Sequence, residues 1–89
     1  MFHYVYILLS KRKNKYITYI GYSNNLKKRL FLHNNSKGAK FTKGSVWKII
    51  YKKKFLYKNK ALKYEYYLKN NKSLRLKYKK KAIENLNVY

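Results

Sequence analysis

The 89-residue sequence contains no cysteine, no proline, only three glycines and only two acidic residues. A chain without cysteine forms neither disulfides nor thiolate metal sites. The N-terminus lacks the basic segment and the run of roughly 7–15 apolar residues that define a signal peptide. No apolar run approaches the roughly 20 residues of a transmembrane helix. We therefore expect a cytoplasmic protein with no disulfides and no membrane partner.

The scarcity of acids restricts the chemistry that the chain can perform. Its only acids are Glu65 and Glu84, whereas two-metal nucleases bridge their ions with several carboxylates. Glu84 stands among lysines, where we expect it to be solvated. His3 and His33 are too far apart for a zinc-binding spacing, and the isolated glycines form no Gly-rich phosphate loop. Any metal would be a single Mg²⁺-like ion held by Glu65, water and substrate phosphate oxygens.

Basic residues are the abundant class: 24 lysines and arginines give a net charge of +22. The electrostatic field of so many positive charges attracts polyanions, of which nucleic acid is the commonest. The alternative is a merely solvated lysine surface, because lysine, asparagine, tyrosine and isoleucine are abundant together, as a coding bias would produce. With 46% hydrophobic and 19% aromatic residues, the chain has enough apolar material for one compact domain over residues 1–89.

Strand-like segments are rich in aromatic and β-branched residues. Three of them are expected, at residues 2–9, 16–22 and 46–51. The first two form a hairpin across a polar turn at 10–15. Gly21, near the end of the second strand, indicates backbone freedom or a close approach there.

Three helices are expected between and after these strands. The first runs to about His33 and is capped by Asn24 or Asn25, the second covers 60–69 with Asn59 as its cap, and the last covers 74–85. A polar loop is expected at 34–45, and residues 70–73 break the second helix from the third. Strands and helices without regular βαβ alternation indicate the α+β class, a small three-stranded antiparallel sheet flanked by helices.

Arg29 is the first candidate for a functional side chain, since the chain has far more lysines than arginines. Helical spacing places Leu26, Leu30 and His33 on one line with Arg29 beside them, while the neighbouring lysines point away. A guanidinium binds phosphate through two parallel hydrogen bonds. The alternative is an arginine that only covers the helix edge.

Glu65 is the second candidate. It lies three residues after Leu62 and three before Leu68, on the apolar stripe of its helix. A carboxylate there is costly unless it is paired, hydrogen-bonded or bound to a metal. The alternative to a metal ligand is an ion pair with a lysine or with Arg29.

Tyr6 and Tyr19 stand on the two paired strands, and Tyr19 precedes Gly21 and the Arg29 helix. With 12 tyrosines in the chain, a single one more often packs than reacts. A phenol is a poor base at its normal pKa near 10, but lysines and a metal ion would make the phenolate easier to form.

Four segments in this order resemble the GIY-YIG nuclease domain, and above all its small stand-alone bacterial members. They are Tyr4-Val5-Tyr6, Tyr19-Ile20-Gly21, Asn25-Leu26-Lys27-Lys28-Arg29-Leu30 and Ala61-Leu62-Lys63-Tyr64-Glu65. His33-Asn34 and the Gly38–Thr42 segment extend the resemblance, which covers roughly residues 3 to 75. Tyr4 replaces the first glycine of the motif, a structural position.

The resemblance implies a Mg²⁺-dependent (or Mn²⁺-dependent) endonuclease with one metal ion, which acts on DNA phosphodiesters and has a role in DNA repair or processing. The implied catalytic residues are Tyr6, Tyr19, Arg29, His33 and Glu65, with Glu65 holding the metal. We expect nucleic-acid backbone to be held by Lys27, Lys28, Lys40 and Lys43.

Two other functions remain open from the sequence. The same fold could be a basic DNA- or RNA-binding module with weak or no catalysis. The chain could also be a structural protein of a ribonucleoprotein whose lysines neutralise RNA. A protein partner is left open as well.

Overall fold

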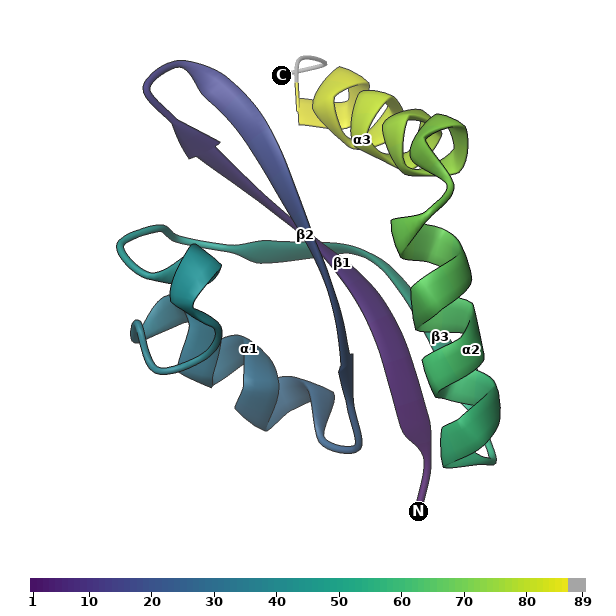
Figure 1. The fold of residues 1–89 in the computed structure, drawn as a ribbon. Coiled ribbons are helices and arrows are strands. Elements are labelled where there is room, and N and C mark those ends of the chain that lie inside the picture. Colours follow the sequence, from purple (N-terminus) through teal and green to yellow (C-terminus); the bar gives the residue numbers. More distant parts are fainter. Residues whose placement is uncertain (87–89) are drawn as a thin grey trace.

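The computed structural model describes residues 1–86, so the last three residues of the expected domain, 87–89, lie outside the described residues. The strands are β1 (His3–Arg12), β2 (Lys15–Ser23) and β3 (Lys48–Phe55). The helices are α1 (Leu26–Asn34), the short 3₁₀ helix η1 (Lys40–Thr42), α2 (Lys58–Lys69) and α3 (Lys72–Leu86). The strands form an antiparallel sheet in the order β2-β1-β3 (Figure 1). This confirms the predicted α+β class.

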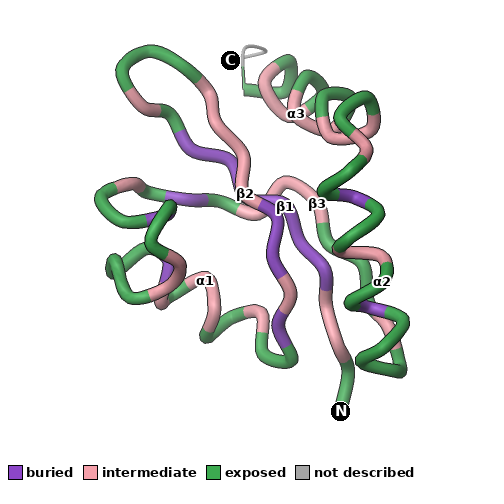
Figure 2. The backbone as a smooth tube through the Cα atoms, in the orientation of Figure 1, coloured by how far each residue is buried: buried purple, intermediate pink, exposed green. Residues whose placement is uncertain are grey.

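Strand β1 is the centre of the fold, and its residues from Val5 to Ser10 are all buried. Val5 and Ile7 pack with Ala61 and Leu68 of α2 on one face of the sheet. Tyr6 lies in a second cluster on the other face, against α1. Figure 1 shows α1 and η1 on one side of the sheet and α2 and α3 on the other. Figure 2 shows that burial is concentrated in the sheet, while the helices are exposed on their outer faces.

The β1–β2 hairpin has a tighter turn than the sequence predicted. Arg12 pairs with Lys15, so only Lys13 and Asn14 connect the strands, and the predicted turn at 10–15 was too long. Both have positive φ, 48° and 67°. Two such residues match the right-handed twist of the flanking strands, which allows the ladder to continue to the turn.

The helix caps agree with the sequence at one helix and differ at another. Asn25 caps α1, because its side chain accepts a hydrogen bond from the Lys28 N–H at 3.1 Å. Asn59 lies inside α2 rather than before it, since the helix begins at Lys58, so its predicted capping role was wrong. Helix α3 begins earlier than predicted, at Lys72, because Asn71 accepts the Leu74 N–H at 3.1 Å.

Strand β3 begins later than predicted and extends further. The Trp47 N–H donates to the Asn34 side chain at 2.6 Å, and the Asn34 amide donates back to the Trp47 carbonyl at 3.1 Å. The backbone of Trp47 is therefore satisfied by α1 rather than by a strand, and β3 starts at Lys48. The strand then runs to Phe55 through three exposed lysines at 52–54, a pattern typical of a protected edge strand.

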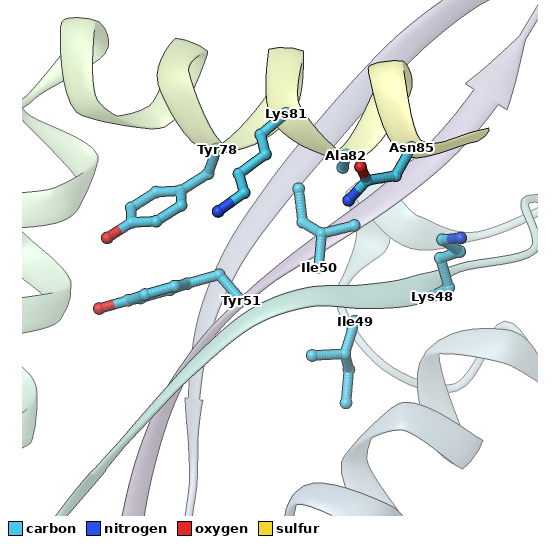
Figure 3. Close-up of a pocket in the computed structure, with 8 residues that line it drawn as sticks. All are labelled: Lys48, Ile49, Ile50, Tyr51, Tyr78, Lys81, Ala82 and Asn85. Atoms are coloured by element: carbon cyan, nitrogen blue, oxygen red, sulfur yellow. The ribbon is translucent and has the colours of Figure 1, made fainter. Parts of the chain in front are cut away.

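A register shift in β3 connects the sheet to α3. Ile7 pairs with Tyr51 and Leu8 with Ile49, so Ile50 is an extra residue. Figure 3 shows Ile50 directed toward α3 and Ile49 directed away from it. Beside them, the Tyr51 ring stacks on Tyr78 of α3 at a centroid distance of 4.1 Å. This contact anchors the last helix to the sheet.

Candidate active site

Tyr6 lies at the centre of the candidate site. Its side chain is 1% exposed, and its hydroxyl lies 2.9 Å from His33 Nε2 of α1. Gly21 stands opposite Tyr6 in the β1–β2 pair, and a Cβ built on Gly21 would overlap the Tyr6 hydroxyl. The glycine therefore provides the close approach that the sequence indicated, by leaving room for the phenol ring.

His33 joins the site from α1 and is completely buried. Its Nδ1 lies 2.8 Å from the Thr42 hydroxyl of η1, so both ring nitrogens have hydrogen-bond partners. Burial, and to a smaller degree the charge of Arg29, lower the pKa of His33 below its ordinary value. The imidazole is therefore neutral near pH 7.

Three of the predicted residues act on the ionisation of Tyr6. Burial raises the pKa of Tyr6 to about 12; Arg29 lowers this pKa, and the charges of Tyr19 and Glu65 raise it. Arg29, Tyr19 and Glu65 come from three different elements, α1, β2 and α2, and each influences the pKa of Tyr6.

Arg29 is half-buried on α1. Its Nε is buried and has no hydrogen-bond partner among residues 1–86. A buried donor without an acceptor is costly, so an oxygen ligand from outside the chain would satisfy this guanidinium. Arg75 on α3 has the same unpaired Nε within residues 1–86.

Tyr19 is half-buried and closes one side of the site. Its ring centroid lies 5.2 Å from that of His33, and its ring stacks on Phe41 at 6.1 Å. Trp47 meets the same ring edge-on at 6.5 Å. Tyr19 is therefore held by an aromatic cluster and remains the more accessible of the two predicted phenols.

Glu65 is 18% exposed and lies 3.5 Å from the ammonium of Lys69, one helical turn further along α2. The lysine ion pair that the sequence left open is therefore present. It is a weak one, since Lys69 is 52% exposed and solvated pairs contribute little. The described residues contain no cluster of three or more potential metal-ligating His, Cys, Asp or Glu side chains. A lone carboxylate fits Mg²⁺, which keeps several waters and is often held by one or two carboxylates with substrate phosphates.

The predicted nucleic-acid contacts and the second acid lie at the surface. Lys27 and Lys28 are exposed on α1, and Lys40 and Lys43 are exposed in and after η1. These four lysines thus stand on the elements that cover the Tyr6 face of the sheet. Glu84 is exposed on α3, as predicted.

Arg12 and Thr42 support the site and were missed by the sequence analysis. The Arg12 guanidinium donates to the Ser45 hydroxyl and to the carbonyls of Phe41 and Lys43, and it lies over the Phe41 ring at 5.1 Å. It thereby fastens the segment that carries Thr42. The scarcity of arginine, which singled out Arg29, was a signal that applied to Arg12 as well.

The groove shown in Figure 3 is separate from this site. It lies between β3 and α3, is lined by residues such as Lys48, Ile50, Lys81 and Asn85, and has a volume of about 410 Å³. Tyr6 packs on the opposite face of the sheet.

Every helix within residues 1–86 is too short or too polar to cross a lipid bilayer.

The chain is similar to several known proteins. Residues 2–81 match the GIY-YIG catalytic domain. A UPF0213 protein of Oceanobacillus iheyensis is 44% identical over 68 residues, covering 75% of this chain and 76% of that protein. A UPF0213 protein of Clostridium perfringens is also 44% identical over 68 residues, covering 75% and 70%. The solution NMR structure of a UPF0213 protein from Bacillus halodurans is 31% identical with a TM-score of 0.47, covering 97% of this chain and 85% of that one. The chain therefore belongs to the GIY-YIG catalytic domain family, which has a nuclease-type fold.

Proposed function

We propose that the protein is an endonuclease that hydrolyses DNA phosphodiester bonds with one divalent metal ion, Mg²⁺ or Mn²⁺. The observation that carries the proposal is the buried Tyr6 hydroxyl, which is hydrogen-bonded to His33 and whose pKa responds to Arg29, Tyr19 and Glu65. The side chains involved come from β1, β2, α1 and α2, which supports a shared role at one site.

Arg29 would bind the phosphate and stabilise the charge that grows on its oxygens. The unpaired Nε favours this role, because a phosphate oxygen would satisfy a donor that otherwise has no acceptor within residues 1–86. The exposed lysines of α1 and η1 would hold the flanking backbone without reading the bases. Affinity would then come from many lysines and turnover from a single arginine.

Tyr19 and Tyr6 would orient the attacking water. Tyr19 is half-buried and is the phenol that solvent reaches. Tyr6 is 1% exposed, and with a pKa of about 12 it keeps its proton at neutral pH. It would contribute as a neutral phenol that is held by its hydrogen bond to His33. We therefore assign direct contact with the water to Tyr19 and alignment of the site to Tyr6.

Glu65 would hold the metal. When bound, the ion would stabilise the negative charge on the departing oxygen, which is why one ion can serve a site with one carboxylate. The long contact to Lys69 leaves the Glu65 carboxylate available as a ligand. The lysine would also limit the cost of the partly buried charge when no ion is present.

Glu65→Gln is the direct test, and Glu84→Gln is the matched control because it removes the same charge from an exposed position. In Mg²⁺, Glu65→Gln is expected to slow DNA nicking by about 100-fold or more and to leave DNA binding within about two-fold. Glu84→Gln is expected to behave as wild type in both assays. Equal nicking by wild type and Glu65→Gln would refute the metal-binding role.

Arg29→Lys tests the guanidinium while it keeps the charge. Turnover is expected to fall by about 100-fold, with binding nearly unchanged. Arg75→Lys is the control, since Arg75 also has a buried, unpaired Nε within residues 1–86 but lies on α3. A large loss of affinity with preserved turnover in Arg29→Lys would contradict the assignment.

The second candidate function is a nucleic-acid-binding module of the same fold with little or no catalysis. The net charge of +22 favours it independently of the site. It would be supported if wild type and the Glu65 and Arg29 variants all bind DNA or RNA alike while none of them cleaves. A role in DNA repair or processing belongs to the first proposal and rests on the family alone.

A further inference from the structure

Thr42 makes two polar contacts beside the site. It is completely buried on η1, and its hydroxyl donates to the Ala39 carbonyl at 2.8 Å. The same oxygen lies 2.8 Å from His33 Nδ1. A threonine hydroxyl has one proton and two lone pairs. Because the proton is directed to Ala39, the hydroxyl is an acceptor toward His33, and Nδ1 carries the hydrogen.

The opposite tautomer of His33 conflicts with the contacts on both sides of the ring. If Thr42 donated to Nδ1, its oxygen would face the Ala39 carbonyl oxygen at 2.8 Å with no proton between them. On the other side of the ring, His33 Nε2–H would donate to the Tyr6 oxygen at 2.9 Å. The Tyr6 proton would then need an acceptor other than His33, although Tyr6 is only 1% exposed.

The segment around Thr42 also fixes the position of the ring. A Cβ built on Gly38 would overlap His33 Nδ1, so the Gly38 backbone lies directly against the imidazole. Arg12 ties the same segment to the end of β1 through the Phe41 and Lys43 carbonyls. His33 is therefore enclosed by a short stretch of chain that is itself held in place.

We propose that Thr42 is a positioning residue that holds His33 in its Nδ1–H tautomer, so that the Tyr6 hydroxyl donates to Nε2 and keeps its oxygen lone pairs free to accept. Because the Tyr6 proton is used for the hydrogen bond to His33, the Tyr6 oxygen can only accept hydrogen bonds from other groups at the site. Oriented chains of hydrogen bonds also polarise one another, which makes the Tyr6 oxygen a better acceptor. The link of this geometry to turnover rests on the proposed nuclease function, whereas the tautomer itself does not.

The tautomer is measured directly by two-bond ¹H–¹⁵N correlation NMR of the imidazole in the protein without DNA or metal. Wild type and Thr42→Ser are expected to show protonated Nδ1 and unprotonated Nε2 for His33. Thr42→Val keeps the shape but removes both hydrogen-bonding functions, and it is expected to lose this signature. Thr18→Val is the matched control, because Thr18 is the other threonine of the chain and lies on β2.

Kinetics supply the second readout. With Mg²⁺ and DNA, Thr42→Val is expected to lower kcat by about 10-fold or more with KM within about two-fold, and Thr42→Ser is expected to restore kcat. A protonated Nε2 in wild type, or an unchanged His33 signature in Thr42→Val, would overturn the proposal. If Thr42→Val does not fold, a protonated Nε2 in wild type or in Thr42→Ser would still overturn the proposal. Failure of every variant to cleave would count against the nuclease function and leave the spectroscopic result standing.

Discussion

Arginine is used at two positions of this chain for two different physical purposes. Arg29 has a buried Nε with no hydrogen-bond partner within residues 1–86 and influences the pKa of Tyr6, whereas Arg12 binds a hydroxyl, two carbonyls and an aromatic face of the chain itself. A lysine at either position would keep the charge and lose the planar fork of donors.

Arg12→Lys is expected to lower the free energy of unfolding by about 1–3 kcal/mol, because one ammonium cannot serve the Ser45 hydroxyl and two carbonyls while it packs on Phe41. Urea denaturation followed by far-UV circular dichroism gives this quantity. Lys37→Gln changes a lysine of the same loop that makes no side-chain hydrogen bond to Arg12, and we expect it to alter the free energy by less than about 0.5 kcal/mol. Equal effects of the two substitutions would show that the contacts of Arg12 do not stabilise the fold.

The stability of the protein is expected to depend on pH through His33. Its native pKa lies below the ordinary 6.5, so the unfolded state binds more protons in the window below that value. The free energy of unfolding is then highest above about pH 6.5 and falls as the pH decreases toward the native pKa. Urea titrations between about pH 5 and 8 measure this slope. His33→Gln is expected to flatten it, and His3→Gln is the control; an unchanged slope in His33→Gln would mean that another group causes the pH dependence.

The candidate catalytic residues were accessible from the sequence, and their supporting residues were not. Glu65 stood out because a carboxylate interrupted an apolar stripe, and Arg29 because it flanked one. Arg12 reaches Ser45, 33 positions away, across an irregular loop whose path no local spacing predicts. Thr42 lies nine positions from His33 in the sequence. Because the intervening segment is a loop without helical or strand periodicity, this separation did not predict a contact.

At the scale of elements, the hairpin offers a clear stability test. Lys13 and Asn14 both adopt positive φ, which asparagine and glycine tolerate better than lysine does. The double change Lys13→Asn with Asn14→Gly is expected to raise the free energy of unfolding by about 0.5–1 kcal/mol, seen as a higher Tm. Lys13→Asn alone tests the first position. A lower Tm for the double variant would mean that the turn is not of the type described.

Element positions were predicted best where the pattern was local. The two hairpin strands and α1 with its Asn25 cap follow from alternation and capping residues, which involve neighbours in the chain. The start of β3 was displaced because Asn34 satisfies the backbone of Trp47, a contact between elements. The Ile50 bulge likewise depends on the packing of α3, which no window of the β3 sequence contains.

At the scale of the molecule, the charge predicts a strongly salt-dependent interaction with DNA. Each phosphate neutralised contributes about −0.9 to the slope of log K against log salt. The double variant Lys27→Gln with Lys28→Gln is expected to reduce the magnitude of this slope by about 2. Lys79→Gln with Lys80→Gln removes the same charge from α3, on the other side of the sheet (Figure 1), and is expected to reduce it less. Fluorescence anisotropy at several NaCl concentrations measures both, and equal slopes for the two variants would argue against binding through α1.

The alternation of side chains along β1 means that the core packing and the position of Tyr6 both depend on the register of this strand. Val5 and Ile7 face one layer and Tyr6 faces the other, so inserting or deleting a single residue there would exchange the two sets. The Tyr6 phenol would then face α2, and an aliphatic side chain would take its place beside His33. A descendant of this chain that loses the candidate site but still folds is therefore expected to do so by replacing individual side chains, with the length of this strand left intact.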